Sequence, residues 1–195
     1  MFVTFEGVDG SGKSTQLELL RAHLAELGRE VVATREPGGT PLGERIRELL
    51  LDGDAITPWA EAALFAAARA ELAERVIRPA LARGADVVCD RYIDSSLVYQ
   101  GIARGLGVER VLELNTAVAD VMPDYTIVLH LDPGTAAKRT GSSPDRIERE
   151  GDDFRAALAD GYRQLAERFP ERVVWLDGSL VADELAARVR GVLDV

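Results

Sequence analysis

The sequence is poor in cysteine and in long apolar runs. Its single cysteine, Cys89, cannot form a disulfide within the chain, which suits a reducing compartment, so we expect a cytoplasmic protein. No run is long and apolar enough to span a membrane, and we see no signal peptide or lipidation motif. Met1 leads directly into an expected strand, which leaves no room for a targeting segment. We therefore expect no membrane association.

The sequence also lacks an excess of basic residues. Its 33 Asp and Glu residues outnumber 23 Lys and Arg residues, for a net charge of −10. Such an acidic chain is a poor partner for nucleic acid or an anionic membrane surface, so we expect neither. An anionic ligand must then be met by local clusters of Arg and Lys.

Short Val-rich runs alternate with longer stretches of helical spacing, which is typical of an α/β protein with a parallel sheet. We find no repeat and no linker, and we expect one domain, 1–195, with a mobile lid at about 139–152 around Gly141 to Pro144. Expected strands are a first one from Phe2, then Glu30–Arg35, Asp86–Asp90, Tyr125–Asp132 and Arg172–Leu176. Expected helices are 13–27, 41–51, 58–83, 94–103, 108–120, 133–139, 153–169 and 180–193.

The long helix expected at 58–83 carries two local signals. Thr57 is placed as its N-cap and Pro58 as its first helical residue. Pro79 predicts a kink or an early end, because proline has no backbone N–H.

The strongest motif lies between the first strand and the first helix. Gly7, Gly12, Lys13 and Ser14 fit the G-x-x-x-x-G-K-[ST] pattern of a phosphate-binding P-loop. Its glycines bring backbone N–H groups close to phosphate oxygens, Lys13 reaches the β/γ-phosphates, and Ser14 would hold Mg²⁺. A chance glycine turn is disfavoured, because the strand and the helix flank the motif. The expected ATP-binding residues are Gly7, Val8, Asp9, Gly10, Ser11, Gly12, Lys13, Ser14 and Thr15.

Two further stretches place polar residues where a ligand could lie. Glu36 belongs to a Pro-Gly-Gly loop after the second strand, and Arg47 on the next helix could reach an anionic group. Phe65 and Arg69 lie four residues apart among alanines, which would suit a stacked nucleobase. By themselves, a plain turn with an exposed Arg47 and a core Phe65 beside a snorkelling Arg69 are the more ordinary interpretations.

The stretch after the third strand predicts function more directly. Asp90 ends that strand where P-loop enzymes place an acid near Mg²⁺, and the planar guanidinium of Arg91 suits a phosphate. Ser96, Tyr99 and Gln100 share one helix face. The mixed-charge run from Arg139 to Glu150 is either a solvated linker or a closing loop that brings arginines to a migrating phosphoryl group.

Together these stretches resemble the bacterial thymidylate kinases, which are P-loop kinases that phosphorylate dTMP. The resemblance spans nearly the whole chain and implies a three-layer α/β/α P-loop fold with a five-stranded parallel sheet. Five blocks carry it: Phe5 to Thr15, Arg35-Glu36-Pro37-Gly38-Gly39-Thr40, Phe65 with Arg69, Asp90-Arg91-Tyr92 with Tyr99-Gln100-Gly101, and Asp145-Arg146-Ile147-Glu148.

The resemblance also implies roles on the acceptor side. Phe65 stacks on thymine and Arg69 bonds its carbonyl edge. Ser96 and Gln100 line the base pocket, with Tyr99 beside the deoxyribose. The dTMP phosphate is held by Arg47 and Arg91. Asp9 and Glu36 lie near the sugar and the Mg²⁺–phosphate region.

On the donor side, Ser14 and Asp90 hold Mg²⁺. The P-loop interior has no basic residue, so the catalytic cation is expected among Arg139, Arg146 and Arg149, with Arg146 favoured. An adenine loop falls near 177–179, and family members are usually homodimers.

The sequence and this resemblance together predict transfer of a phosphoryl group from ATP to dTMP, giving ADP and dTDP. Another nucleoside monophosphate or deoxynucleoside kinase of this fold is the main alternative. A regulatory GTPase is disfavoured because no Asn-Lys-x-Asp motif occurs. A binding module without activity would be expected to lack the lid arginines and the second set of phosphate arginines.

Overall fold

The computed structural model describes residues 1–139, 146–147 and 150–195, of which residues 133, 137 and 152 are described by backbone alone. Five strands form one parallel sheet in the order β2-β3-β1-β4-β5. This confirms the predicted five-stranded parallel sheet. The strands are β1 Phe2–Glu6, β2 Val31–Arg35, β3 Asp86–Asp90, β4 Tyr125–His130 and β5 Val173–Asp177.

Helical segments connect the strands, as the alternating pattern predicted. Most of their bounds lie within two residues of the expected ones. The segments are α1 Lys13–Glu26, α2 Pro41–Leu51, α3 Pro58–Leu72, η1 Ala73–Ile77, α4 Arg78–Ala82, α5 Ile93–Ser96, η2 Leu97–Ala103, α6 Val108–Val118, α7 Pro133–Arg139, α8 Asp152–Arg168 and α9 Ala182–Leu193.

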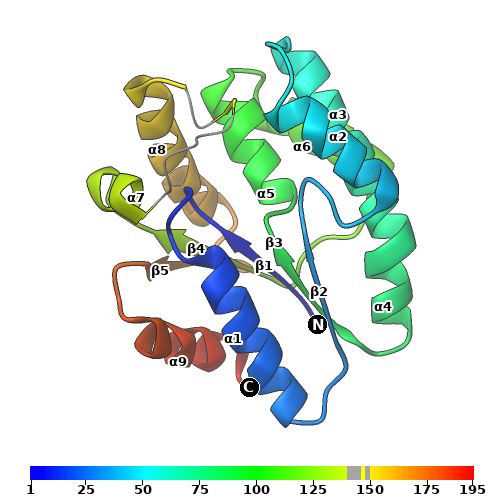
Figure 1. Cartoon of the computed structure of the whole chain (residues 1–195), viewed down its shortest axis with the longest axis vertical. Helices are drawn as coiled ribbons and strands as arrows, with labels where there is room; N and C mark the ends of the chain where they lie inside the picture. Colours follow the sequence, from blue (N-terminus) through cyan, green and yellow to red (C-terminus); the bar gives the residue numbers. More distant parts are fainter. Residues whose placement is uncertain (140–145, 148–149) are drawn as a thin grey trace.

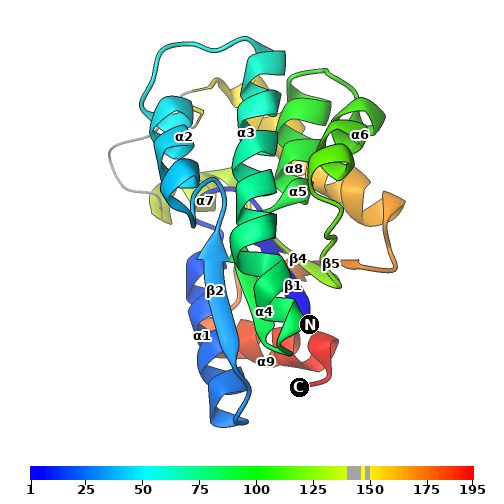
Figure 2. The same ribbon diagram turned by 90° about the vertical axis from the view of Figure 1, so that its right-hand side faces the viewer.

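The helices cover both faces of the sheet (Figures 1 and 2). On one face, α1 and α9 pack on the β1 side chains of Val3 and Phe5. On the other face, Phe2 packs with α3, η1 and α4, while η2, α6 and α8 cover β4 and β5. Because alternate side chains of a strand point to opposite faces, β1 is buried along its whole length. The result is the predicted three-layer α/β/α arrangement. None of the described helices is long and apolar enough to cross a membrane.

The helix predicted over 58–83 runs from Pro58 to Ala82, with a π-helical stretch in its middle. This stretch, η1, ends one residue before Arg78, and Pro79 lies at the start of α4. Proline has no backbone N–H to donate, and the wider π-helical turn before it changes the pairing of carbonyls with N–H groups. The helix therefore continues past Pro79. At the other end Thr57 is the N-cap residue, but its side chain makes no capping hydrogen bond.

The order of the strands brings three loops to one edge of the sheet. The central strand β1 lies between β3 and β4, and in register Phe5 and Arg35 both lie opposite Asp90. The backbone N–H of Glu36 bonds to the carbonyl of Asp90, and that of Arg91 bonds to the carbonyl of Phe5. The carboxyl ends of β1, β2 and β3 are thereby fastened together, which is where open parallel sheets bind ligands.

Candidate active site

The loop between β1 and α1 has the conformation that its glycines predict. Gly7 has φ +131°, and a Cβ there would lie 2.5 Å from the carbonyl oxygen of Leu129. Gly12 has φ +97° and is the N-cap residue of α1. Both positions disfavour any residue with a side chain, so the loop wraps closely at the positive end of the helix dipole.

Lys13 is buried beneath this loop. Its Nζ donates to the carbonyls of Gly7 and Val8 at 3.1 and 3.0 Å and lies 3.5 Å from a carboxylate oxygen of Asp9. Burial and the neighbouring Arg91 lower the pKa of Lys13, while Asp9 opposes that shift. The ammonium group is therefore bonded to two neutral carbonyl oxygens, which a charged phosphate oxygen could replace.

Ser14 and Asp90 meet, as the predicted metal site requires. The Ser14 hydroxyl donates to Oδ2 of Asp90 at 2.7 Å. In the part of the chain that the structure describes, no three His, Cys, Asp or Glu side chains gather at one point. One hydroxyl and one carboxylate fit Mg²⁺, because this ion usually completes its shell with water and substrate phosphates.

A cavity of about 570 Å³, which we term the P-loop cavity, opens in front of these residues. Basic side chains from five different segments reach it, so this acidic chain does gather a local cationic cluster there. Its lining residues are Asp9, Gly10, Gly12, Lys13, Ser14, Thr15, Arg35, Glu36, Arg47, Asp90, Arg91 and Arg139.

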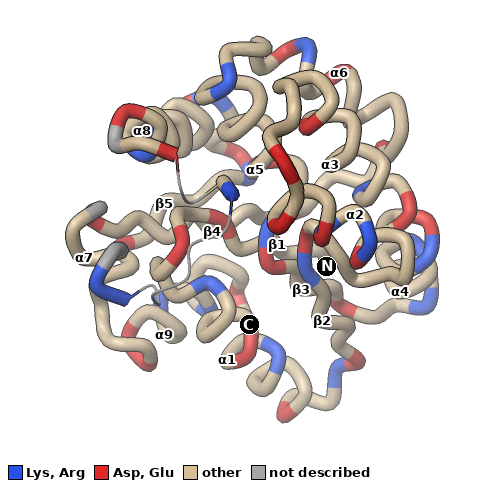
Figure 3. The backbone as a smooth tube through the Cα atoms, turned by 45° about the horizontal axis from the view of Figure 1, so that its top comes forward, with Lys and Arg blue, Asp and Glu red and all other residues tan. Residues whose placement is uncertain are grey.

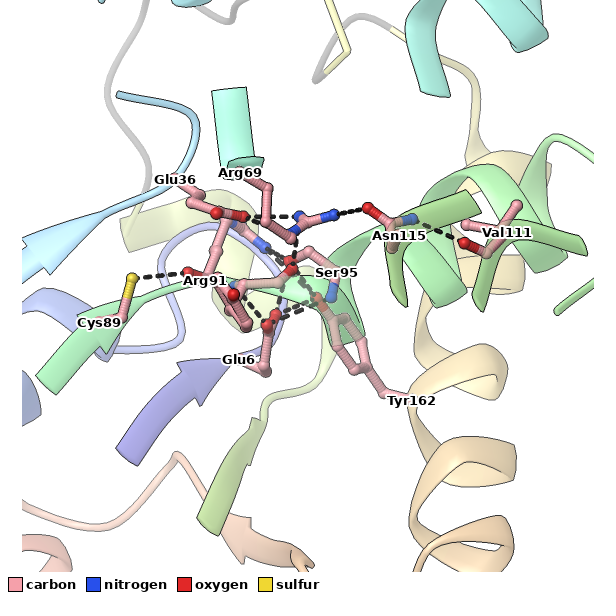
Figure 4. A network of polar contacts seen from close by, with 10 residues as sticks. Glu6, Glu36, Arg69, Cys89, Arg91, Ser95, Val111, Asn115 and Tyr162 are labelled. Carbon is pink, nitrogen blue, oxygen red and sulfur yellow. Dashed lines mark hydrogen bonds and ion pairs between the residues drawn. The ribbon is translucent and has the colours of Figure 1, made fainter. Parts of the chain in front are cut away.

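Arg91 contacts three side chains through its guanidinium group, and two of them are shown in Figure 4. It pairs with Asp9 at 2.7 Å, and its Nη1 donates to the hydroxyl oxygens of Ser95 and Tyr162, both at 3.3 Å. Its φ of +68° is rare for a residue with a side chain and costs backbone energy. The contacts around Arg91 therefore have to hold both its backbone and its guanidinium.

Glu6 is the anchor of this arrangement. Its buried carboxylate accepts from the backbone N–H groups of Tyr92 and Ser95 and from the hydroxyls of Ser95 and Tyr162. Burial first, and the Asp94 carboxylate second, raise the pKa of Glu6. Both hydroxyls that meet Arg91 are thus fixed from behind by the same carboxylate, as Figure 4 shows.

A second cavity, which we term the side cavity, adjoins the first and shares Asp9, Glu36, Arg47 and Arg91 with it. It brings together four of the predicted base- and sugar-binding side chains: Phe65, Ser96, Tyr99 and Gln100. The Ser96 hydroxyl and one carboxylate oxygen of Glu36 are buried without a hydrogen-bond partner among the described residues. Such groups are costly unless a ligand satisfies them. The side cavity is also lined by Pro37, Leu51, Ser95 and Ile147.

Arg69, predicted to contact a base edge, lies behind Glu36 and lines neither cavity, and its contact with a base stays a prediction. It is 1% exposed, and its Nε and Nη2 donate to Oε2 of Glu36 at 2.9 and 2.6 Å. The carbonyl of Tyr92 and the side chain of Asn115 take two more N–H groups. Burial raises the pKa of Glu36 to about 7, although Arg69 opposes this. Glu36 is thus the member of this pair that reaches the cavities.

The structure separates the two described lid arginines. Arg139 lines the P-loop cavity and donates to the carbonyl of Gly178 at 3.0 Å. Arg146, the favoured candidate, instead donates to the carbonyl of Leu50 and to Glu61, both at 2.8 Å, and lines neither cavity. The buried carboxylate of Glu61 thus holds Arg146 against α2 and α3, while Arg139 reaches the P-loop cavity, and the catalytic role of either arginine stays a prediction. Arg149 lies outside the described residues.

Several residues of the site were given no role by the sequence analysis. Arg35 lines the P-loop cavity, Ile147 lines the side cavity, and Glu6 and Tyr162 support Arg91. Glu6 lies directly before the P-loop motif, but its partners come from loops and helices distant in the chain. Only the strand-end position of Arg35 was a usable signal.

Comparison with known proteins places the chain in a family. The family model for thymidylate kinases matches residues 5–189. A thymidylate kinase of Symbiobacterium thermophilum is 48% identical over 198 residues, which cover 100% of this chain and 92% of that protein. One of Pelotomaculum thermopropionicum is 50% identical over 185 residues, covering 91% and 85% respectively.

A solved structure agrees with these relatives. The crystal structure of thymidylate kinase from Ehrlichia chaffeensis superposes with a TM-score of 0.83 at 35% identity, covering 99% of this chain and 98% of that one. The fold is therefore that of the P-loop NTPases, as predicted. By the extent of the family match and of these relatives, the chain belongs to the thymidylate kinase family.

Proposed function

We propose that this protein transfers the γ-phosphoryl group of ATP to the phosphate of dTMP, giving ADP and dTDP for DNA synthesis. The observation that carries this is the pair of adjoining cavities, which share Asp9, Glu36, Arg47 and Arg91. A triphosphate on the P-loop and a monophosphate ester in the side cavity would meet at these shared residues. Phosphoryl transfer depends mainly on such positioning and on neutralising charge.

On the donor side, the backbone of Gly7 to Thr15 would cradle the phosphates of ATP, and Lys13 would turn from its carbonyl partners to the β/γ-phosphates. Ser14 and Asp90 would hold Mg²⁺, which neutralises phosphate charge when it is bound. Arg139 is the cation best placed to reach the transferring group, since it already lines the P-loop cavity.

On the acceptor side, Arg47 and Arg91 would hold the dTMP phosphate in line with ATP. Arg47 reaches both cavities and donates only to the carbonyl of Pro37 among the described residues, so its remaining N–H groups can meet a phosphate. Phe65 would stack on thymine, with Ser96 and Gln100 at its polar edge and Tyr99 beside the deoxyribose. Arg69 would support the pocket through Glu36, and one Nη1 N–H without a hydrogen bond among the described residues remains for a base carbonyl.

We further propose a single kinase unit over 1–195 that acts in the cytoplasm as a homodimer. Support for the dimer comes from large apolar side chains exposed on α2, α3 and α6, helices that lie beside one another (Figure 2). These are Leu42, Leu49, Trp59 and Val118. Exposed apolar groups that gather on neighbouring helices favour a protein interface.

Label transfer tests the reaction directly. With ATP labelled at the γ-phosphate, Mg²⁺ and dTMP, we expect labelled dTDP to form in step with ADP. Label appearing only as inorganic phosphate, at a rate independent of dTMP, would show an ATPase and contradict the proposal.

A further inference from the structure

Glu61, on α3, is a buried carboxylate that links Gln100 of the side cavity to two arginines outside the cavity. It is 1% exposed, and Gln100 donates its Nε2 to Oε1 of Glu61 at 2.9 Å. Arg104, which directly follows η2, bonds to both carboxylate oxygens at 3.2 Å, and Arg146 donates to Oε2 at 2.8 Å. Four donor nitrogens from three side chains thus converge on one carboxylate that lines neither cavity.

The charge state of Glu61 determines what it can do to Gln100. Burial opposes ionisation, but hydrogen bonds from Gln100, Arg104 and Arg146 hold the pKa of Glu61 below its ordinary value. An ionised carboxylate accepts hydrogen bonds and cannot donate them. The half of the Gln100 amide that faces Glu61 must therefore be its NH₂ group.

This fixes what Gln100 offers to a ligand. Gln100 is 1% exposed and lines the side cavity. With one N–H of its NH₂ group bonded to Glu61, the amide turns its carbonyl oxygen away from that carboxylate, so this oxygen is the acceptor that Gln100 offers to a ligand. Ser96 cannot discriminate in the same way, because its unpartnered hydroxyl can donate or accept.

We propose that Glu61 is a positioning residue for base selection: it locks the Gln100 amide so that the side cavity accepts a hydrogen bond from a base whose ring nitrogen carries a proton. Thymine and uracil carry N3–H, whereas N3 of cytosine is itself an acceptor and would face the Gln100 oxygen. Unpaired and repelling polar groups in a desolvated site discriminate strongly. The inference rests on the proposed function, because it assumes a pyrimidine monophosphate in the side cavity.

The test compares dTMP with 5-methyl-dCMP, which keeps the methyl group and differs only at C4 and N3. In Glu61→Gln, residue 61 can either accept or donate, so the Gln100 amide is free to flip. We expect the ratio of kcat/KM for dTMP to that for 5-methyl-dCMP to fall about tenfold. A merely structural role would lower both acceptors by the same factor and leave the ratio unchanged, which would overturn the proposal.

Two further variants serve as controls. Glu74→Gln makes the same chemical change at an exposed carboxylate on η1 that pairs with Arg78, away from Gln100, so the ratio should stay at the wild-type value. Gln100→Leu removes the acceptor itself and should lower the ratio even if Glu61→Gln fails to fold. An unchanged ratio in Gln100→Leu, or a lowered one in Glu74→Gln, would overturn the proposal.

These outcomes are separable from failure of the proposed function. If the wild type phosphorylates dTMP but Glu61→Gln has the same kcat/KM ratio as the wild type, only the role of Glu61 is contradicted. A wild-type protein that does not phosphorylate dTMP at all contradicts the proposed function and, with it, this inference.

Discussion

Lys13 and Arg91 share one counter-ion, Asp9, in front of the P-loop. Asp9 lies 3.5 Å from Lys13 and 2.7 Å from Arg91, and both cations border the P-loop cavity. In our account, Lys13 belongs to the donor phosphates and Arg91 to the acceptor phosphate. Asp9 would therefore set the spacing between the two anions that react.

Replacing Lys13 tests its role at the triphosphate. Lys13→Ala removes a preorganised cation at the developing phosphate charge, and we expect kcat to fall at least about 100-fold. Initial rates of ADP formation with dTMP measure this. Lys138→Ala, at an exposed lysine on α7, is the matched control and should keep the wild-type rate. A Lys13→Ala variant with near-normal kcat would exclude the P-loop assignment.

Asp9 should also make stability depend on acid. Burial opposes its ionisation, but Arg91 and Lys13 hold the pKa of Asp9 below its ordinary value of 3.8. A depressed folded-state pKa stabilises the protein above the ordinary pKa, and this contribution is lost as the pH falls below about 4. In Asp9→Asn, the free energy of unfolding should therefore fall less between pH 5 and pH 3 than in the wild type. Urea unfolding of both proteins at both pH values measures this free energy. An equal fall between pH 5 and pH 3 in Asp9→Asn and in the wild type would contradict the pairing of Asp9 with Arg91 and Lys13.

At the scale of elements, α8 supports a residue that belongs to the β3–α5 junction. Tyr162, on α8, meets both Glu6 of β1 and Arg91 after β3 (Figure 4). The helix is thus part of the acceptor-phosphate site although it contributes no lining residue to either cavity.

Removing the hydroxyl of Tyr162 tests this link. Tyr162→Phe deletes one hydrogen bond to a charged guanidinium and one to a carboxylate, so we expect KM for dTMP to rise about tenfold while kcat changes less. Tyr125→Phe on β4, whose hydroxyl makes no hydrogen bond among the described residues, is the control. Unchanged KM for dTMP in Tyr162→Phe would show that Arg91 is held without α8.

The elements themselves were largely predictable, because short β-branched runs and helical spacing reflect local preferences and burial. The site was less so. The P-loop and the strand-end pair of Asp90 and Arg91 could be found from local patterns. The placement of Arg69 could not, because its partner Glu36 lies 33 residues away in the chain and competes with any ligand for the guanidinium. The surroundings of Arg146 could not be predicted for the same reason, since Glu61 holds it from a separate helix.

At the scale of the whole molecule, acidic and basic residues are mixed along the chain, but the fold gathers basic side chains at one cavity. Figure 3 shows acidic and basic residues interspersed over most elements. The sheet topology nevertheless brings Lys13, Arg35, Arg47, Arg91 and Arg139 to one cavity. A net charge of −10 disfavours unspecific binding of polyanions, while this cluster provides a local site for phosphates.

The central claim is that the side cavity takes dTMP as the acceptor of a phosphoryl group from ATP. The most direct measurement is ADP production from Mg-ATP with dTMP, dUMP, dCMP, dGMP, UMP and AMP supplied one at a time. Our account predicts the highest kcat/KM for dTMP, with dUMP, which shares its N3–H, ahead of dCMP. A clear preference for another monophosphate would retain the kinase fold but contradict the roles of Phe65, Ser96 and Gln100, and no activity with any acceptor would contradict the proposed function as a whole.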